Sequence, residues 1–205
     1  HGLLSDVGYE RLSGTQVLRD FVELPSQLFE HWIGEPEVLR RHARHWSTGE
    51  PIADSLIERI QAARRFGQAY ETVRYTASAL VDMAVHASTE PVGDVVAFEQ
   101  RVLAERGGPA AAGMNHRLVH FQHLFAGSGY AAGYYVYLWA ELLDADAYDA
   151  FVEAGDPFDA RVAERLRRWV YASGDSVEPG EAYRAFRGRE PRIEPMLREK
   201  GLIDG

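Results

Sequence analysis

The chain contains no cysteine among its 205 residues. This absence excludes disulfide bonds and thiolate metal sites, so any bound metal would need histidine and carboxylate ligands. Long hydrophobic runs are missing as well, because no stretch approaches the roughly 20 apolar residues that a membrane helix requires. Together the two absences predict a cytoplasmic protein that has no membrane partner.

Basic residues are fewer than acidic ones, with 22 Lys and Arg against 31 Asp and Glu and a formal net charge of -9. Binding of nucleic acid needs clustered Lys and Arg to neutralise phosphates, and only short basic groups such as residues 40–44 occur. A nucleic-acid partner is therefore excluded. The length suffices for a substantial buried core, and the 46% hydrophobic content is that of a globular protein.

Helical periodicity dominates the sequence, and there is no convincing series of alternating strands. The patterns predict an all-α fold that forms a single domain over residues 1–205. The predicted helices cover residues 15–33, 35–45, 53–65, 67–87, 92–106, 130–143, 145–154 and 159–172, followed by two short helices on either side of residues 188–191. Pro25 lies inside the first of them and is expected to kink it, because proline lacks a backbone donor. Residues 107–115 read as an irregular linker.

A polar stripe runs along the first predicted helix, at spacings of 4, 3, 4 and 3 residues. Its members are Gln16, Asp20, Glu23, Gln27 and Glu30. Apolar residues surround the stripe, and a carboxylate in such a place must be paired, hydrogen-bonded or bound to a metal if it is buried. The pattern alone favours a solvated acidic stripe over a metal ligand or a catalytic carboxylate.

Three histidines, His116, His120 and His123, are spaced 4 and 3 residues apart. On a helix such spacing could hold one zinc ion. However, Arg117 stands where the usual catalytic motif places a glutamate, and the neighbouring residues make a helix uncertain. The pattern favours histidines that pack or face a substrate over a three-histidine metal site.

Three tyrosines, Tyr130, Tyr134 and Tyr137, follow the same rhythm and continue to Glu141. Such a row is more often core than function, but buried phenols would all need hydrogen-bond partners. Small residues at positions 127–133 leave open space beside the row. The combination fits a groove whose phenols hydrogen-bond a peptide or stabilise an oxyanion.

Three long segments resemble the thimet oligopeptidase and peptidyl-dipeptidase family of zinc metallopeptidases. They are "HGLLSDVGYERLSGTQVLRDFVELPSQLFEHW", "AAGYYVYLWAELLDADAYDAF" and "FRGREPRIEPMLREKGL". The second is more similar to bacterial peptidyl-dipeptidases than to thimet oligopeptidase itself. The resemblance covers essentially the whole chain and implies the multi-helix C-terminal part of a zincin-like catalytic domain.

The resemblance also implies roles for single residues. Glu23 corresponds to the third zinc ligand of the family, and Asp20, one turn earlier, would support the ligands. His123, Tyr130 and Tyr137 correspond to the family's catalytic, substrate-facing residues, with Tyr134 as a further substrate contact. The implied activity is zinc-dependent hydrolysis of short peptides, with release of C-terminal dipeptides.

The sequence departs severely from the family pattern: it has no His-Glu pair and therefore no H-E-x-x-H motif. It also has two more residues between His123 and Tyr130 than is usual in thimet oligopeptidase. We expect a chain truncated before the two histidine ligands and the general base, inactive alone, with zinc bound only in the intact parent. Its expected partners are short peptides, the missing N-terminal part of the parent and, through an uncovered channel face, other copies of itself. The alternative is a non-catalytic helical module that binds peptides.

Overall fold

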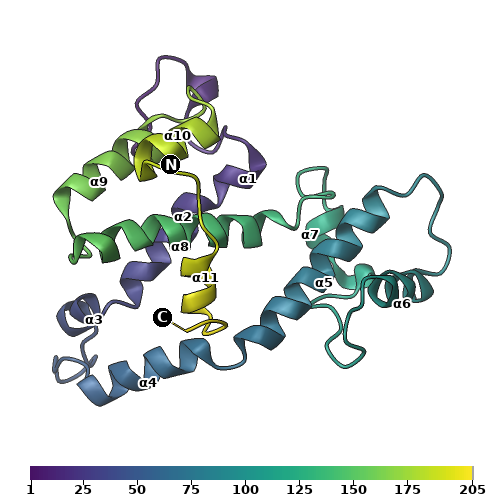
Figure 1. Ribbon diagram of the computed structural model, residues 1–205, viewed down its shortest axis with the longest axis horizontal. Coiled ribbons are helices and arrows are strands. Elements are labelled where there is room, and N and C mark those ends of the chain that lie inside the picture. Colours follow the sequence, from purple (N-terminus) through teal and green to yellow (C-terminus); the bar gives the residue numbers. More distant parts are fainter. Residues whose placement is uncertain (205) are drawn as a thin grey trace. The chain divides into compact units, whose positions relative to one another are not determined.

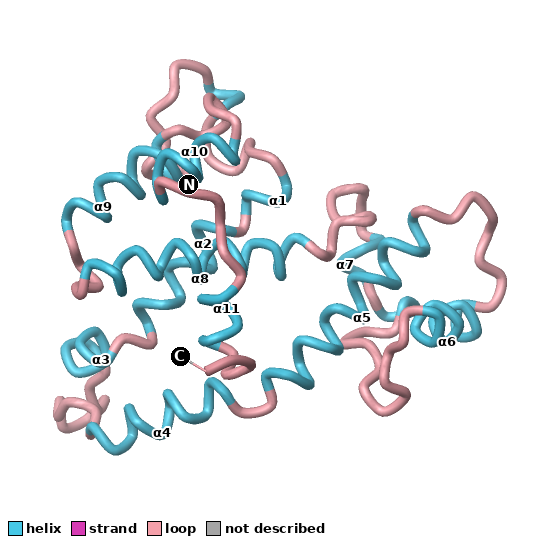
Figure 2. Tube along the Cα trace, in the orientation of Figure 1, coloured by secondary structure: helices cyan, strands magenta, loops and turns pink. Residues whose placement is uncertain are grey.

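The computed structural model describes residues 1–204, which are helices joined by loops and turns (Figures 1 and 2). No strand occurs in this range, only an isolated bridge between Arg44 and Pro51. The all-α fold class is therefore confirmed. The chain divides into two compact units, one formed by His1–Phe66 with the residues from Trp139 onward, the other by Gly67–Leu138. A single catalytic domain over residues 1–205 stays a prediction.

The first unit contains most of the helices. They are α1 (Arg19–Val22), α2 (Leu24–Ile33), α3 (Pro36–His42), α4 (Asp54–Arg65), the main part of α8 (Val136–Ala154), α9 (Ala160–Leu166), α10 (Pro179–Arg187) and α11 (Glu194–Glu199). A 3₁₀ turn at Glu10–Leu12 precedes α1, and a π-helical segment, Arg167–Ala172, extends α9. Several helices begin where the sequence supplies an N-cap acceptor: Asp159 caps α9, and Glu178 caps α10.

The second unit is built on two longer helices, α5 (Gln68–His86) and α6 (Val95–Glu105). The Asp94 side chain caps α6 by accepting the Ala97 N–H. A 3₁₀ turn at Leu118–His120 and the short α7 (Gln122–Phe125) follow the irregular segment at residues 107–115, which the sequence predicted as a linker.

The first predicted helix is wrong in its bounds. It begins at Arg19 rather than Thr15, and Glu23 separates it into α1 and α2. Pro25 lies in the first turn of α2, where the backbone N–H that proline lacks would have no helical partner. The proline therefore starts a new helix instead of bending a continuous one.

The predicted helices at 130–143 and 145–154 are also corrected. Helical structure starts only at Val136 and then runs without a break to Ala154 as α8. Residues 127–135 stay outside the helix, and Ala132 within them adopts a left-handed backbone with φ of 55°. Tyr130 and Tyr134 therefore do not share a helix with Tyr137.

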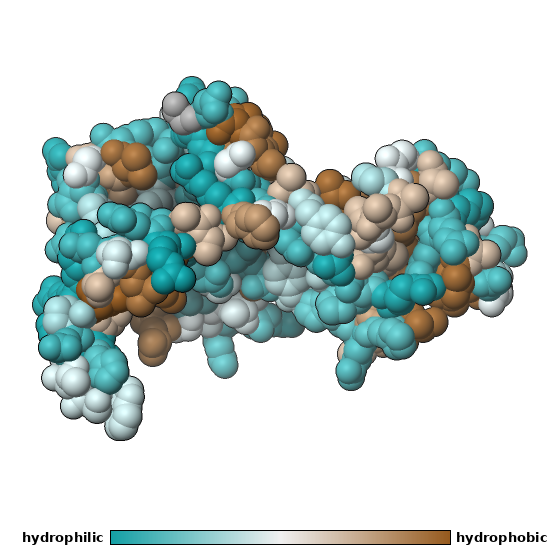
Figure 3. Space-filling model, turned by 90° about the horizontal axis from the view of Figure 1, so that it is seen from below, coloured by the Kyte–Doolittle hydropathy of each residue, from teal (hydrophilic) through white to brown (hydrophobic). Residues whose placement is uncertain are grey.

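Each unit has its own hydrophobic core. In the first, α2, α9 and α10 pack around α8 (Figure 1), and Leu24, Leu28, Phe151 and Phe186 are almost completely buried. In the second, Val81 of α5 and Val102 of α6 pack with Leu118, Phe121 and Leu124. Burial of one such side chain contributes about 1.5–3 kcal/mol, so each core stabilises its own unit. Figure 3 shows the hydrophobic groups on one face in separate patches among hydrophilic residues.

Candidate functional site

The histidine and tyrosine motifs come together in a pocket of the second unit. The pocket has a volume of about 430 Å³. It is lined by Tyr75, His116, His120, Phe121, Gln122, His123, Tyr134 and Tyr137. These residues come from α5, α7, the first turn of α8 and the loops between them. Residues that the sequence placed in two separate motifs thus face one cavity.

The polar centre of the pocket is a hydrogen bond of 2.8 Å between His123 Nε2 and the Tyr137 hydroxyl group. Tyr130 packs against both partners. Its ring centroid lies 4.3 Å from that of His123 and 5.7 Å from that of Tyr137, with the two phenol rings nearly parallel. His123 is exposed and the two tyrosines are half-buried. The three side chains therefore form a packed aromatic cluster that is partly open to solvent.

Tyr134 forms an inner wall of the pocket. Its ring stacks on Tyr75 at 4.9 Å and meets the edge of Phe121 at 4.7 Å. Burial raises the pKa of the Tyr134 phenol, although a hydrogen bond with Asn115 lowers it in part. The phenol thus stays protonated at neutral pH and keeps its capacity to donate a hydrogen bond.

Two buried carboxylates that sequence reasoning missed hold the pocket segments in place. Glu99 of α6 accepts hydrogen bonds from the Leu118 N–H at 2.6 Å and from Arg117 Nε at 2.7 Å. Asp82 of α5 accepts the N–H groups of Ala132 and Tyr134. The available signal was an acidic residue at an otherwise apolar helical position, as in the "LVDMAV" of residues 80–85.

The three histidines do not form a metal site in the described part of the chain. His116 precedes the 3₁₀ turn, His120 ends it and His123 belongs to α7, so they share no helix. All three are exposed. Residues 1–204 contain no group of three or more histidine, aspartate or glutamate side chains that could hold a metal ion. The interpretation of these residues as packing or substrate-facing histidines stays a prediction.

Glu23 and Asp20 lie in the first unit, at the junction of α1 and α2. Both are half-buried, whereas Gln16 and Glu30 at the ends of the stripe are exposed. The Ser26 hydroxyl donates to the Glu23 carbonyl at 2.9 Å and lies 3.3 Å from Glu23 Oε2. A carboxylate suits zinc, but one carboxylate is not a zinc site, so the described residues alone do not form one. The ligand role of Glu23 and the supporting role of Asp20 stay predictions.

A further polar cluster in the first unit had no sequence signal. His31 of α2 makes a 2.8 Å contact with Asp144 of α8 and a 3.2 Å contact with Glu199 of α11. Its ring also stacks on Tyr148 at 4.6 Å. Burial alone would lower the pKa of His31, but the hydrogen bonds to both carboxylates outweigh it and raise the pKa to about 9. The cluster therefore ties three helices together with a charged imidazole.

Comparison with known proteins identifies the chain. Residues 1–202 match the model of Peptidase family M3. The chain belongs to this family. M3 proteins are metallopeptidases, and the family resemblance seen in the sequence motifs is confirmed.

Several curated relatives align with nearly all of this M3 chain. Dipeptidyl carboxypeptidase of Salmonella typhimurium is 42% identical over 205 residues, and that of Escherichia coli K12 is 41% identical over the same length. Oligopeptidase A of Escherichia coli K12 is 36% identical over 208 residues. Each alignment covers 98% of this chain but 30% of the relative. The chain thus spans about 30% of the length of these relatives.

The helices of this M3 chain are also informative about membranes. Between residues 1 and 204, none combines the length and the apolar character that crossing a bilayer demands.

Proposed function

We propose that this chain is the part of a zinc-dependent M3 peptidase that supplies one zinc ligand and the substrate-facing aromatic cluster. The complete enzyme hydrolyses short peptides and releases C-terminal dipeptides. The observation that carries the proposal is the hydrogen bond between His123 Nε2 and the Tyr137 hydroxyl group, packed against Tyr130 beside an open pocket. The two dipeptidyl carboxypeptidases among the relatives support the release of dipeptides.

Glu23 is the zinc ligand in this proposal, and Asp20 supports it from the preceding turn. Their half-burial favours these roles, because a partly desolvated carboxylate gains from a cationic partner. Residues 1–204 contain no complete set of metal ligands. The remaining ligands must therefore come from another part of the complete protein. Bound zinc would supply Lewis-acid activation of the attacking water.

The aromatic cluster binds the peptide and stabilises the oxyanion. Tyr137 lines the pocket and Tyr130 stacks on it. A phenol that donates to a peptide carbonyl donates more strongly once that oxygen becomes negative. His123 orients the Tyr137 hydroxyl through their hydrogen bond. Tyr134, whose phenol pKa is raised further by burial, adds a donor to the substrate backbone.

In this proposal the isolated chain lacks both tight zinc binding and activity. Without the other zinc ligands and a general base, the 205-residue chain neither binds zinc tightly nor hydrolyses peptides. The complete peptidase acts in the cytoplasm.

The alternative to release of C-terminal dipeptides is cleavage within a peptide, because another relative is named oligopeptidase A. A second candidate, a non-catalytic peptide-binding module, would use the same pocket without zinc.

The experiment compares the isolated chain with the complete protein encoded by its gene, whose extent is read from the nucleotide sequence upstream of the His1 codon. We expect the isolated chain to lack stoichiometric zinc and hydrolysis that chelators inhibit. In the complete protein, Glu23→Gln should abolish zinc binding and activity. Glu30→Gln, at an exposed position of the same stripe, is the matched control and should change neither.

Tyr137→Phe provides a separate test of the aromatic cluster. It should lower kcat by about 100-fold while zinc binding remains, because it removes one oxyanion donor. Full zinc content in Glu23→Gln would overturn the ligand assignment. A gene that starts just before His1, together with peptide binding by the zinc-free chain, would favour the binding module.

A further inference from the structure

Asp82 is a carboxylate with almost no contact with solvent. It lies on α5 of the second unit, and its exposed fraction is 1%. Its sequence neighbour Val81 belongs to the hydrophobic core of the unit. A buried charge is costly unless hydrogen bonds or an opposite charge compensate it, so the partners of Asp82 indicate what it is for.

Each oxygen of the carboxylate has a partner. Oδ1 accepts the Ala132 N–H at 3.1 Å, and Oδ2 accepts the Tyr134 N–H at 2.8 Å. His86, one turn further along α5, places Nδ1 at 2.7 Å from Oδ1 and at 3.0 Å from the Asp82 carbonyl oxygen. Because both neighbours of Nδ1 are acceptors, this nitrogen carries the proton. Asp82, held by His86, therefore binds a short turn that lies about 50 residues later in the sequence.

The turn that Asp82 binds has an unfavourable backbone. Ala132 has φ of 55°, a left-handed conformation that residues with a side chain adopt infrequently. Gly133 is closely packed, since a Cβ atom there would lie 3.3 Å from the Tyr130 Cα. The turn is closed by a 2.9 Å hydrogen bond from the Gly133 N–H to the Tyr130 carbonyl. Such a conformation persists only where its surroundings impose it, and Asp82 supplies the two bonds that do so.

The same turn carries two aromatic residues of the candidate site. Tyr130 packs on His123, and Tyr134 forms the inner wall of the pocket against Tyr75. The backbone N–H of Tyr134 is itself one of the groups that Asp82 binds. A substitution of Asp82 should therefore change the positions of Tyr130 and Tyr134 even though Asp82 itself would not touch a bound peptide.

We propose that Asp82 and His86 form a positioning pair that fixes the Tyr130–Tyr134 turn and thereby sets Tyr134 in the pocket wall and Tyr130 against His123. His86 holds the carboxylate in place, and the carboxylate holds the turn. What the phenols do there rests on the proposed function, whereas the positioning itself is a property of this chain.

The first measurement is amide hydrogen exchange in the 205-residue chain. In Asp82→Asn, only one side-chain oxygen remains to accept, so one of the two N–H bonds is lost. We expect exchange at Ala132 or Tyr134 to become at least about tenfold faster, the scale of losing a hydrogen bond to a charged acceptor. Asp94→Asn is the matched control: Asp94 accepts the Ala97 N–H outside the pocket, and asparagine caps helices equally well.

The second measurement distinguishes positioning from general stability. The Tyr130 ring lies 4.3 Å from the His123 ring, so its ring current shifts the His123 imidazole resonance. Asp82→Asn should move this resonance in the same direction as Tyr130→Leu does, whereas Asp94→Asn should leave it unchanged. His86→Ala should reproduce the effect, and His86→Gln, which keeps a donor, should restore most of the original shift.

The possible outcomes are distinct. Faster exchange confined to the turn, with a shifted His123 resonance, supports the proposal. Unchanged exchange and resonance in Asp82→Asn overturn it. If Asp82→Asn unfolds the second unit, the His86 variants provide the test. The proposal is then overturned if His86→Ala has the same amide exchange and the same His123 resonance as the unsubstituted chain. None of these readouts uses zinc or hydrolysis, so they can fail or succeed independently of the proposed function.

Discussion

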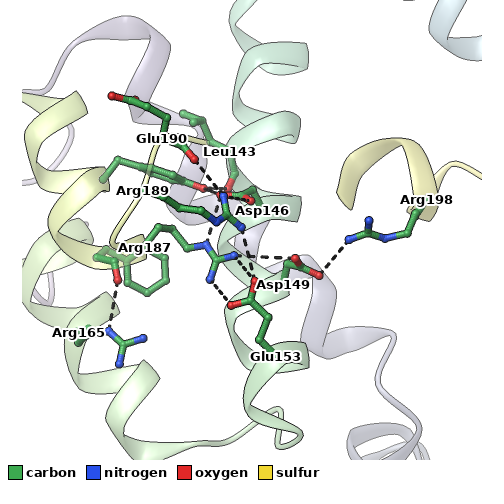
Figure 4. A network of polar contacts seen from close by, with 11 residues as sticks. Leu143, Asp146, Asp149, Glu153, Arg165, Arg187, Arg189, Glu190 and Arg198 are labelled. Carbon is green, nitrogen blue, oxygen red and sulfur yellow. Dashed lines mark hydrogen bonds and ion pairs between the residues drawn. The ribbon is translucent and has the colours of Figure 1, made fainter. Parts of the chain in front are cut away.

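Asp146 of α8 has no exposed surface, yet three polar side chains converge on it. The Tyr183 hydroxyl donates to Oδ2 at 2.7 Å, Arg187 Nε lies 3.3 Å from the same oxygen, and Arg189 Nη1 lies 2.7 Å from Oδ1. In Figure 4 the Arg187 side chain reaches between Asp146 and Glu153. The Arg187 side chain is only 2% exposed, so these carboxylates must compensate its positive charge in place of water.

We predict that Asp146→Asn lowers the free energy of unfolding by about 3 kcal/mol, because it leaves a buried guanidinium without its buried counter-ion. Urea unfolding followed by circular dichroism measures the change. Glu153→Gln is the matched control, since it removes another carboxylate partner of Arg187, one whose side chain is 56% exposed. It should cost at most about 1 kcal/mol. Equal costs for the two variants would contradict the importance of the buried pair.

His31 offers a prediction about pH. Its pKa in the folded chain, about 9, is above its usual value of 6.5. The folded chain therefore holds this proton more tightly than the unfolded chain, and the stabilisation is fully present below pH 6.5. It is lost as the pH rises through about 9. Burial raises the pKa of Asp144 to about 6, so that group titrates below this window.

We expect the free energy of unfolding to fall by about 2 kcal/mol between about pH 7 and about pH 9.5 through His31. His31→Phe keeps a ring that can stack on Tyr148 but cannot titrate. The difference in stability between the unsubstituted chain and this variant should therefore shrink over the same range. A difference that stays constant with pH would contradict a charged His31.

Among the connections between elements, the turn after the π-helical segment is the most constrained. Gly174 has φ of 49°, and a Cβ atom added there would lie 2.0 Å from the Leu12 carbonyl oxygen. The Asp175 N–H donates to the same oxygen at 2.9 Å, and the Asp6 N–H donates to the Ala172 carbonyl. The N-terminal loop thus lies directly against this turn.

Gly174→Ala should cost more than about 3 kcal/mol, because backbone atoms must move to admit the methyl group. Gly188, which ends α10, is the matched control. It also has a left-handed backbone, with φ of 75°, but nothing lies within 4 Å of an added Cβ. Gly188→Ala should cost only about 1 kcal/mol. Thermal unfolding of both variants measures the difference, and similar costs would show that the Leu12 contact is unimportant.

At the scale of the whole molecule, the residues with proposed chemical roles are divided between two units. Glu23 and Asp20 belong to the first unit, with its core around α8. His123, Tyr130 and Tyr137 belong to the second, with its core between α5 and α6. The two cores have no residue in common, so each set of candidate residues is supported by a separate hydrophobic cluster.

Local pattern in the sequence determined much of this fold. Helices α4, α5 and α6 lie within one to three residues of their predicted ends, because apolar periodicity and end signals act over a few neighbouring residues. The motifs also indicated the peptidase family, which the comparison with known proteins confirms. The histidines and tyrosines of the two motifs could be picked out as candidates, since their types and spacing are visible in the chain. Tyr75, Phe121 and Gln122, which also line the pocket, carried no such signal.

Only the tertiary structure decided how those residues meet. The helical rhythm placed Tyr130 and Tyr134 on a helix, but Asp82, some 50 residues earlier, binds their turn in a left-handed conformation that local propensity does not favour. The cluster of His31, Asp144 and Glu199 likewise joins helices far apart in sequence. The physical reason is common to both. A buried charge is stabilised by polar groups that lie close to it in space, and this proximity cannot be read from the spacing of residues along the chain.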